Sequence, residues 1–235
     1  MKLDRLTLLS PFPIPLEGIG VIRPPVLSEV AKLGQALYNG YLNLLALSRE
    51  RFLDMQGLPD QTEGSLFQLL TMNRDTRELL EAALGFFLYG EVQYAPRGGC
   101  FFVREENRRP TAITPENFTE LCGCILQLNY LDKSGAMAGS PKNQRAARIL
   151  AKLEAAKQRQ RPKGNRKDLD LSNMISALCT QHNSYNLTNI WSMTVYQLYD
   201  QFFRQNYKNQ LDVAMHWSAW GTEKFDFTQW FSNDG

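Results

Sequence analysis

An aromatic-rich stretch near the carboxyl end, residues 189–220, constrains the fold more than any other part of the chain. Its large apolar side chains recur every three or four positions, as at Val195, Leu198 and Phe202. That spacing places them on one face of an α-helix, which has 3.6 residues per turn. Thr194 comes directly before the run and has a hydroxyl that can cap the first turn. We therefore predict a long helix that begins after Thr194.

Besides this apolar face, the same predicted helix carries a second row of aromatic side chains. A helix that is apolar on more than one side is either enclosed by its own protein or keeps a face for a partner. Tyrosine and tryptophan are favoured at interfaces. Two interpretations stay open: the rings fill this protein's own core, or they form a partner-binding surface. The candidate partner-binding residues are Tyr196, Tyr199, Phe203, Tyr207, Trp217 and Trp220.

The composition suits a globular protein with one large domain or two small ones. The chain has 235 residues, of which 43% are hydrophobic and 21% charged. The amino-terminal apolar run is too short for a signal peptide and is followed by prolines. No apolar run approaches the roughly 20 residues that span a bilayer. We therefore predict no membrane contact, a cytoplasmic location, and reduced thiols at Cys100, Cys122, Cys124 and Cys179.

The amino-terminal half of the chain mixes strand and helix patterns. Residues 11–27 are rich in proline, which excludes a helix, and the Gly18–Gly20 centre indicates a small hairpin or extended arm. That arm either adds to a partner's sheet or packs on its own domain. Ser28 is expected to cap a single helix that runs to about Phe52. Shorter helices are predicted at 65–72 and 75–88.

A β-hairpin and two further helices complete the prediction. Gly98 and Gly99 supply the positive φ values of a tight turn between strands 91–94 and 100–104. A helix is predicted from Pro115 to near Asp132, and another is capped by Asp168 or Ser172. The predicted fold is α+β and mainly α. Its parts are an N-terminal helical part with the hairpin at 1–132, a flexible basic linker and helix at 133–167, and a C-terminal aromatic-rich helical part at 168–235.

The linker carries most of the positive charge of the chain. Between Lys142 and Lys167 there are ten Lys or Arg and one acidic residue, a net +9, so the remainder carries −7 against the total of +2. Clustered basic residues can bind nucleic acid or an acidic protein face, or form a solvated excursion. No aromatic ring is interleaved for base stacking, so nucleic acid is not the favoured partner. The basic patch comprises Arg145, Arg148, Lys152, Arg159, Arg161 and Lys163.

No pattern in the chain indicates catalysis or a metal centre. Cys122 and Cys124 in a helix would point apart, and Cys122 and Cys179 fall on predicted core faces. Neither His182 nor His216 has a neighbouring serine and acid at a recognisable spacing. Phosphate-binding, dinucleotide-binding and zinc-protease motifs are missing from the sequence. We therefore predict a non-enzymatic protein without cofactor or metal.

Three segments near the carboxyl end resemble a family of small tail proteins from phages and prophages of Gram-positive bacteria. They are Leu178-Cys-Thr-Gln-His182, Asn189-Ile-Trp191, and the run TVYQLYDQF from Thr194 to Phe202. The proline-bounded lead-in, Leu33-Gly34, Tyr38–Tyr41 and Thr114-Pro-Glu-Asn-Phe118 are similar to the same family.

The resemblance implies a phage tail assembly chaperone that acts in the cytoplasm of a bacterial host. Its implied partner is the tape-measure protein, a long helical chain with an exposed apolar stripe. The tail tube protein and self-association are further options. The alternatives are a structural tail or baseplate component of the virion and a nucleic-acid-binding accessory protein. An aromatic surface that receives an amphipathic helix agrees with the first of these functions.

Overall fold

The computed structural model describes residues 1–106, 109–131 and 170–219. The chain divides into two compact units. The first comprises Met1–Ala136 with Thr194–Tyr196, and the second comprises Met137–Met193 with Gln197–Gly235. Helices dominate, with one two-stranded and one three-stranded antiparallel sheet, so the predicted mainly α, α+β fold is confirmed. The predicted linker at 133–167 lies outside the described residues.

The first unit begins with a short helix and the hairpin that the sequence predicts. Helix α1 (Arg5–Leu9) is capped by Asp4, and strands β1 (Ile14–Leu16) and β2 (Gly20–Ile22) pair antiparallel. The hairpin packs on its own domain: the Val21 carbonyl accepts from Tyr89 N–H at 2.9 Å. The Ile19 carbonyl accepts from the Thr111 hydroxyl at 2.7 Å. Of the two options for this arm, packing on its own domain is therefore confirmed.

The single helix predicted from Ser28 to Phe52 is wrong, because three helices occupy this region. They are α2 (Leu27–Leu33), α3 (Gln35–Leu45) and α4 (Arg49–Gln56). Gly34 separates the first two with φ +89° and ψ +134°, a conformation that breaks a helix and that other residues rarely adopt. Ser48 begins the third, since its side chain accepts from Arg51 N–H. The apolar spacing continues across both breaks, which is why it indicated one helix.

Two helices agree with their predicted positions. Helix α5 (Leu66–Met72) starts after Ser65, whose hydroxyl accepts from Gln68 N–H at 3.3 Å. Helix α6 (Arg74–Phe87) starts after Asn73, whose side chain accepts from Asp75 N–H at 2.8 Å. Each cap satisfies a backbone donor that the first helical turn leaves unpaired.

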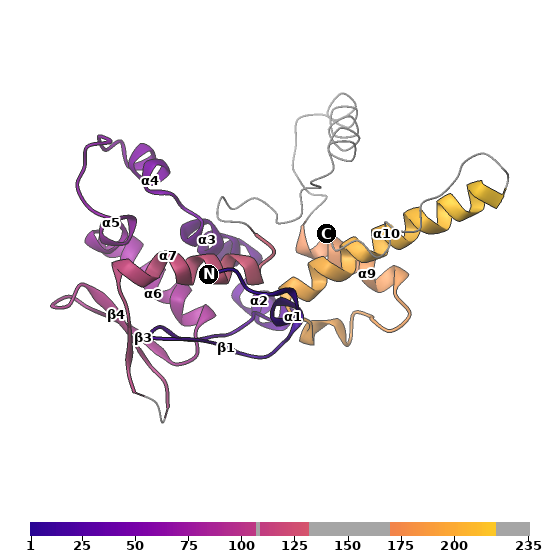
Figure 1. The fold of residues 1–235 in the computed structure, drawn as a ribbon, viewed down its shortest axis with the longest axis horizontal. Coiled ribbons are helices and arrows are strands. Elements are labelled where there is room, and N and C mark those ends of the chain that lie inside the picture. The colour runs from indigo at the N-terminus through magenta and orange to yellow at the C-terminus, as the bar shows by residue number, and fades with distance from the viewer. Residues whose placement is uncertain (107–108, 132–169, 220–235) are drawn as a thin grey trace. The chain divides into compact units, whose positions relative to one another are not determined.

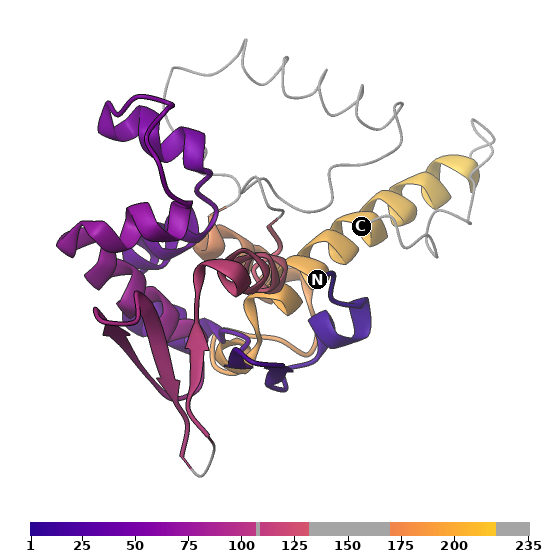
Figure 2. The same ribbon diagram turned by 60° about the vertical axis from the view of Figure 1, so that its left-hand side comes forward.

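A three-stranded antiparallel sheet contains the predicted hairpin and one further strand. Strands β3 (Glu91–Ala95) and β4 (Cys100–Arg104) form the hairpin, which confirms that prediction. Strand β5 (Thr111–Ile113) adds to the free side of β4 and was not predicted. Its three residues are too few to show an alternating pattern. Figures 1 and 2 show the sheet beside α6 and α7.

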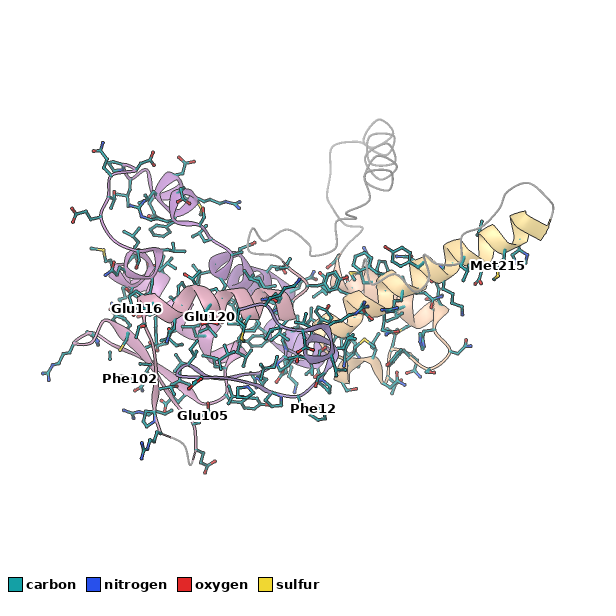
Figure 3. All side chains as sticks on the ribbon, viewed as in Figure 1. Phe12, Phe102, Glu105, Glu116, Glu120 and Met215 are labelled. Atoms are coloured by element: carbon teal, nitrogen blue, oxygen red, sulfur yellow. The ribbon has the colours of Figure 1, made fainter. Side chains whose placement is uncertain are left out.

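Aromatic rings join one face of this sheet to the helices. Phe67 of α5 packs edge-on against Phe101 of β4, with ring centroids 5.8 Å apart. Its ring also lies 5.1 Å from Phe118, on α7 (Pro115–Leu128). On the other face Phe102 is 40% exposed (Figure 3). Helix α7 ends at Leu128, ahead of the predicted Asp132, and Tyr130 follows with a left-handed φ of 59°.

Side chains from two helices occupy backbone groups on the outer strands of the sheet. On β3, Tyr94 N–H donates to the Glu81 carboxylate at 2.9 Å. On β5, the Ala112 carbonyl accepts from the Asn117 amide at 2.9 Å. Unpaired backbone groups on an edge strand attract other strands. These contacts therefore reduce the capacity of either edge to pair with another chain.

The second unit contains α9 (Leu171–Gln181), the short 3₁₀ helix η2 (Ile190–Ser192) and most of α10 (Val195–Ala219). Asp170 precedes α9, in place of the predicted Ser172 or of Asp168, which lies outside the described residues. The prediction that the long helix begins after Thr194 is confirmed. Its first turn belongs to the first unit, where Val195 N–H donates to the Pro25 carbonyl at 3.0 Å. Among the described helices, none combines the length and apolarity needed to cross a membrane.

Candidate partner-binding site

Helix α10 buries one face along its first turns. Val195 and Leu198 are 1% and 0% exposed. Asp200 is also buried, and its carboxylate pairs with Arg204 Nε at 3.1 Å one turn later. A buried carboxylate needs charge and hydrogen-bond partners to offset its lost hydration. Arg204 therefore helps to hold this turn of the helix in place.

Further along, the link between α10 and α9 becomes polar. Gln205 donates to the Asn209 side chain at 3.1 Å, and Asn209 donates to Gln181 of α9 at 3.0 Å. Hydrogen bonds between side-chain amides therefore join the two helices at this turn.

The predicted aromatic residues Tyr196, Tyr199, Phe203 and Tyr207 follow one another at steps of three and four residues. They therefore share one side of α10. Tyr196 packs inside the first unit, where its ring lies 5.1 Å from that of Tyr130. Within the second unit, Tyr199 and Phe203 stack with ring centroids 6.5 Å apart. Tyr207 is 44% exposed.

The structure leaves this ridge accessible in part. Tyr199 and Phe203 are half-buried. Burial first, and then the Asp170 carboxylate, raise the pKa of the Tyr199 hydroxyl. The rings are therefore neither fully enclosed nor fully solvated. We name Tyr199, Phe203 and Tyr207 the aromatic ridge.

Apolar exposure continues toward the end of the helix. Met215, two turns beyond Tyr207, is 41% exposed (Figure 3). Val213 is 56% exposed, and fourteen residues at ~100° each place it about 40° around the helix from Tyr199, the same step that separates neighbouring rings of the ridge. Met215 lies about 160° around the helix from Tyr199, about 120° from Phe203 and about 80° from Tyr207, so it is off the ridge and makes a useful control position.

Trp220 and the basic patch, from Arg145 to Lys163, lie outside the described residues. Trp217 lies on α10, but its side chain is outside the described part.

The cysteines occupy apolar surroundings. Cys100, Cys122 and Cys124 are buried and Cys179 is half-buried, all as free thiols. Burial raises the pKa of both Cys122 and Cys179, which makes their thiolates scarcer at neutral pH. Within the described ranges, no three His, Cys, Asp or Glu side chains lie together as a metal site would require.

One surface feature was missed in the sequence. The turn between α9 and α10 exposes Leu187 and Trp191, which are 60% and 37% exposed. Trp191 Nε1 donates to the Leu187 carbonyl at 2.7 Å, so the two residues are neighbours. The sequence signal for this surface is its lack of charged residues, since no Asp, Glu, Lys or Arg occurs from Leu171 to Tyr199.

Comparison with known proteins gives one similarity. Residues 160–233 match the family model described as the YomV second domain. This part of the chain, which includes α9, η2 and α10, is thus similar to a phage-derived protein family. Searches of curated proteins and of solved structures found no match.

Proposed function

We propose that this chain is a non-enzymatic phage tail assembly chaperone that binds an amphipathic helix of the tape-measure protein on the aromatic ridge. The supporting observation is the half-open ridge of Tyr199, Phe203 and Tyr207. It lies in the part of the chain that is similar to a phage-derived family. A tape measure would present an apolar helical stripe before the tail tube encloses it. Such a stripe is the natural complement of a ridge of rings.

The ridge has the physical properties of a reversible binding surface. Rings that are already half-buried lose little conformational freedom on binding, because stacking holds Tyr199 and Phe203 in place. Complete burial of a large apolar side chain contributes about 1.5–3 kcal/mol. Several partly buried rings therefore suit a contact that forms during assembly and can later be released.

Co-expression with fragments of a phage tape-measure protein tests the proposal. We expect a soluble complex, and we expect Tyr207→Ala to weaken it by at least about tenfold, as loss of an interface tyrosine commonly does. Tyr207 is exposed, so its replacement is not expected to disturb folding. Titration calorimetry with a soluble helical fragment measures the change.

Met215→Ala is the matched control, because it removes an exposed apolar side chain from another side of the same helix. It should leave the affinity unchanged. Equal losses in Tyr207→Ala and Met215→Ala, or fragments that stay insoluble and unbound, would refute binding at the ridge.

The composition of purified particles separates a chaperone from a structural component of the virion. A chaperone should be missing or substoichiometric by quantitative mass spectrometry. A fixed stoichiometry in mature tails would instead favour a tail or baseplate subunit. The nucleic-acid alternative depends on the basic patch, and a salt titration of DNA and RNA binding tests it, since phosphate contacts weaken as salt rises.

A further inference from the structure

The longest stretch without Asp, Glu, Lys or Arg in this chain extends from Leu171 to Tyr199, although 21% of all residues are charged. Much of it faces solvent, where charged residues are normally common. Its exposed positions on α9 and in the following turn hold Ser, Thr, Asn and Gln, together with Leu187 and Trp191. We name these exposed residues the charge-free face. Depletion of charge and enrichment of tryptophan are typical of the centre of an interface.

Hydrogen bonds within the turn hold this face in a defined shape. The Asn186 side chain accepts from Thr188 N–H at 2.8 Å, and the Asn189 side chain accepts from Asn186 N–H at 2.9 Å. The Asn189 amide also donates to the Ser184 carbonyl at 2.9 Å. Ile190 and Met193, 0% and 5% exposed, anchor the turn from below. The exposed Leu187 and Trp191 are therefore held in position before a partner binds, which lowers the entropic cost of binding.

The lack of charged residues on the charge-free face limits which partner surfaces can cover it. A charged partner would lose water from its charges without gaining a counter-charge. A neutral surface avoids that cost. Hydroxyl and amide side chains both donate and accept hydrogen bonds, whereas lysine only donates and a carboxylate only accepts. A face built from hydroxyls and amides can therefore pair with an identical face.

We propose that two copies of this chain associate through the charge-free face, with Leu187 and Trp191 at the centre of the contact. A twofold arrangement uses the same patch on both copies, and it is the commonest symmetry of soluble homo-oligomers. The residues that form the charge-free face bring no like charges of their own together in this arrangement. The inference goes beyond the proposed function, since it concerns a surface other than the aromatic ridge.

Sedimentation velocity of the full chain over a range of concentrations tests the proposal. We expect a reversible dimer whose dissociation constant hardly changes with salt, because no ion pairs contribute. Leu187→Glu should weaken the dimer by at least about tenfold, since two carboxylates then approach each other across the axis. Leu187 is 60% exposed, so the variant is expected to fold.

A charge-swap experiment makes the test specific to a second copy. Leu187→Glu and Leu187→Lys should each be mainly monomeric alone and should associate when mixed. Met72→Glu, at a 79% exposed position of the first unit, is the control and should dimerise as the unaltered chain does. A monomer at all concentrations, or a dimer that is unaffected by Leu187→Glu, would overturn the proposal. Tape-measure binding is measured separately with Tyr207→Ala, so the two proposals can fail independently.

Discussion

The carboxylate of Glu81 accepts a hydrogen bond from the backbone N–H of Tyr94 at 2.9 Å. Glu81 lies on α6 and Tyr94 on an outer strand of the three-stranded sheet. A side chain of the protein itself thus occupies a donor that a strand from another chain would use. On β5, the Asn117 amide likewise occupies a backbone acceptor, the Ala112 carbonyl. The first unit is therefore poorly suited to binding partners by strand addition.

Glu81→Ala should uncover this strand edge. We expect the free energy of unfolding to fall by about 1 kcal/mol, the usual net contribution of a hydrogen bond. Hydrogen exchange at the Tyr94 amide should become faster, because its acceptor is lost. Urea denaturation and exchange measured by NMR report the two effects. Glu81→Gln keeps an acceptor oxygen and should retain slower exchange; equal exchange rates in the two variants would contradict the assigned role.

Gly34 and Gly40 should respond to alanine in opposite directions. Neither has an atom within 4 Å of a new Cβ, so sterics do not distinguish them. Gly34 has φ +89°, and alanine there should cost about 1–3 kcal/mol in backbone strain. Gly40 lies inside α3, where alanine should stabilise by about 0.5–1 kcal/mol. Denaturant unfolding of both variants checks the signs, and a stabilising Gly34→Ala would contradict the break between α2 and α3.

Two arginine–carboxylate pairs of the same spacing should differ in their contribution to stability. Arg204 pairs with the buried Asp200, whereas Arg74 pairs with the exposed Glu78. Arg204→Ala removes a charged hydrogen-bond partner from the buried Asp200 carboxylate and should destabilise by about 1–3 kcal/mol. Arg74→Ala should have no measurable effect, as is common for surface pairs. Thermal unfolding of the two variants provides the comparison, and equal losses would argue against burial as the cause.

The thiols should differ in reactivity. Cys179 is half-buried, whereas Cys100, Cys122 and Cys124 are buried. Burial raises the pKa of Cys122 and Cys179, so their thiolates are scarce, and access then decides the rate of alkylation. We expect iodoacetamide to modify Cys179 first in the folded protein. Peptide mass spectrometry over time identifies the order, and unfolding in urea should remove the differences.

Alkaline pH should destabilise the fold through Cys122. The folded state keeps the Cys122 proton above the ordinary thiol pKa of 9.0, while the unfolded chain releases it. The unfolded chain then binds fewer protons, so stability falls as pH rises above about 9. Below pH 9 the Cys122 thiol is protonated in both the folded and the unfolded state, so its full contribution to folding stability is present. Urea titrations across this range should show a shallower fall in Cys122→Ala, and identical slopes would exclude this thiol as a cause.

Local signals in the sequence were sufficient for much of the fold. The Thr114-Pro115 start and the Gly98-Gly99 turn act within a few residues. Elements that begin or end at such signals were located well. The break at Gly34 was not, because apolar spacing continues through it and only the backbone angle reveals it. Strand β5 was missed because its stability comes from pairing with β4.

The candidate site was predictable only in outline. Helical spacing placed Tyr199, Phe203 and Tyr207 on one side of α10, but it did not predict how far each side chain is exposed to solvent. The Tyr196–Tyr130 contact joins residues far apart in the chain, and the local sequence around neither residue indicates this contact. Leu187 and Trp191 were overlooked because they follow no periodic pattern. Their exposure results from the Asn186 and Asn189 hydrogen bonds that shape the turn.

The hydrogen bond from Val195 N–H to the Pro25 carbonyl has a consequence for the order of events during synthesis. Thr194 forms a bridge with Val26, and both belong to the first unit. A ribosome therefore has to translate most of the chain before the amino-terminal unit can close completely. Nascent chains halted before residue 194 should be more sensitive to protease in this region than chains released from the ribosome. Completion of the first unit is thus a late step in the folding of the chain.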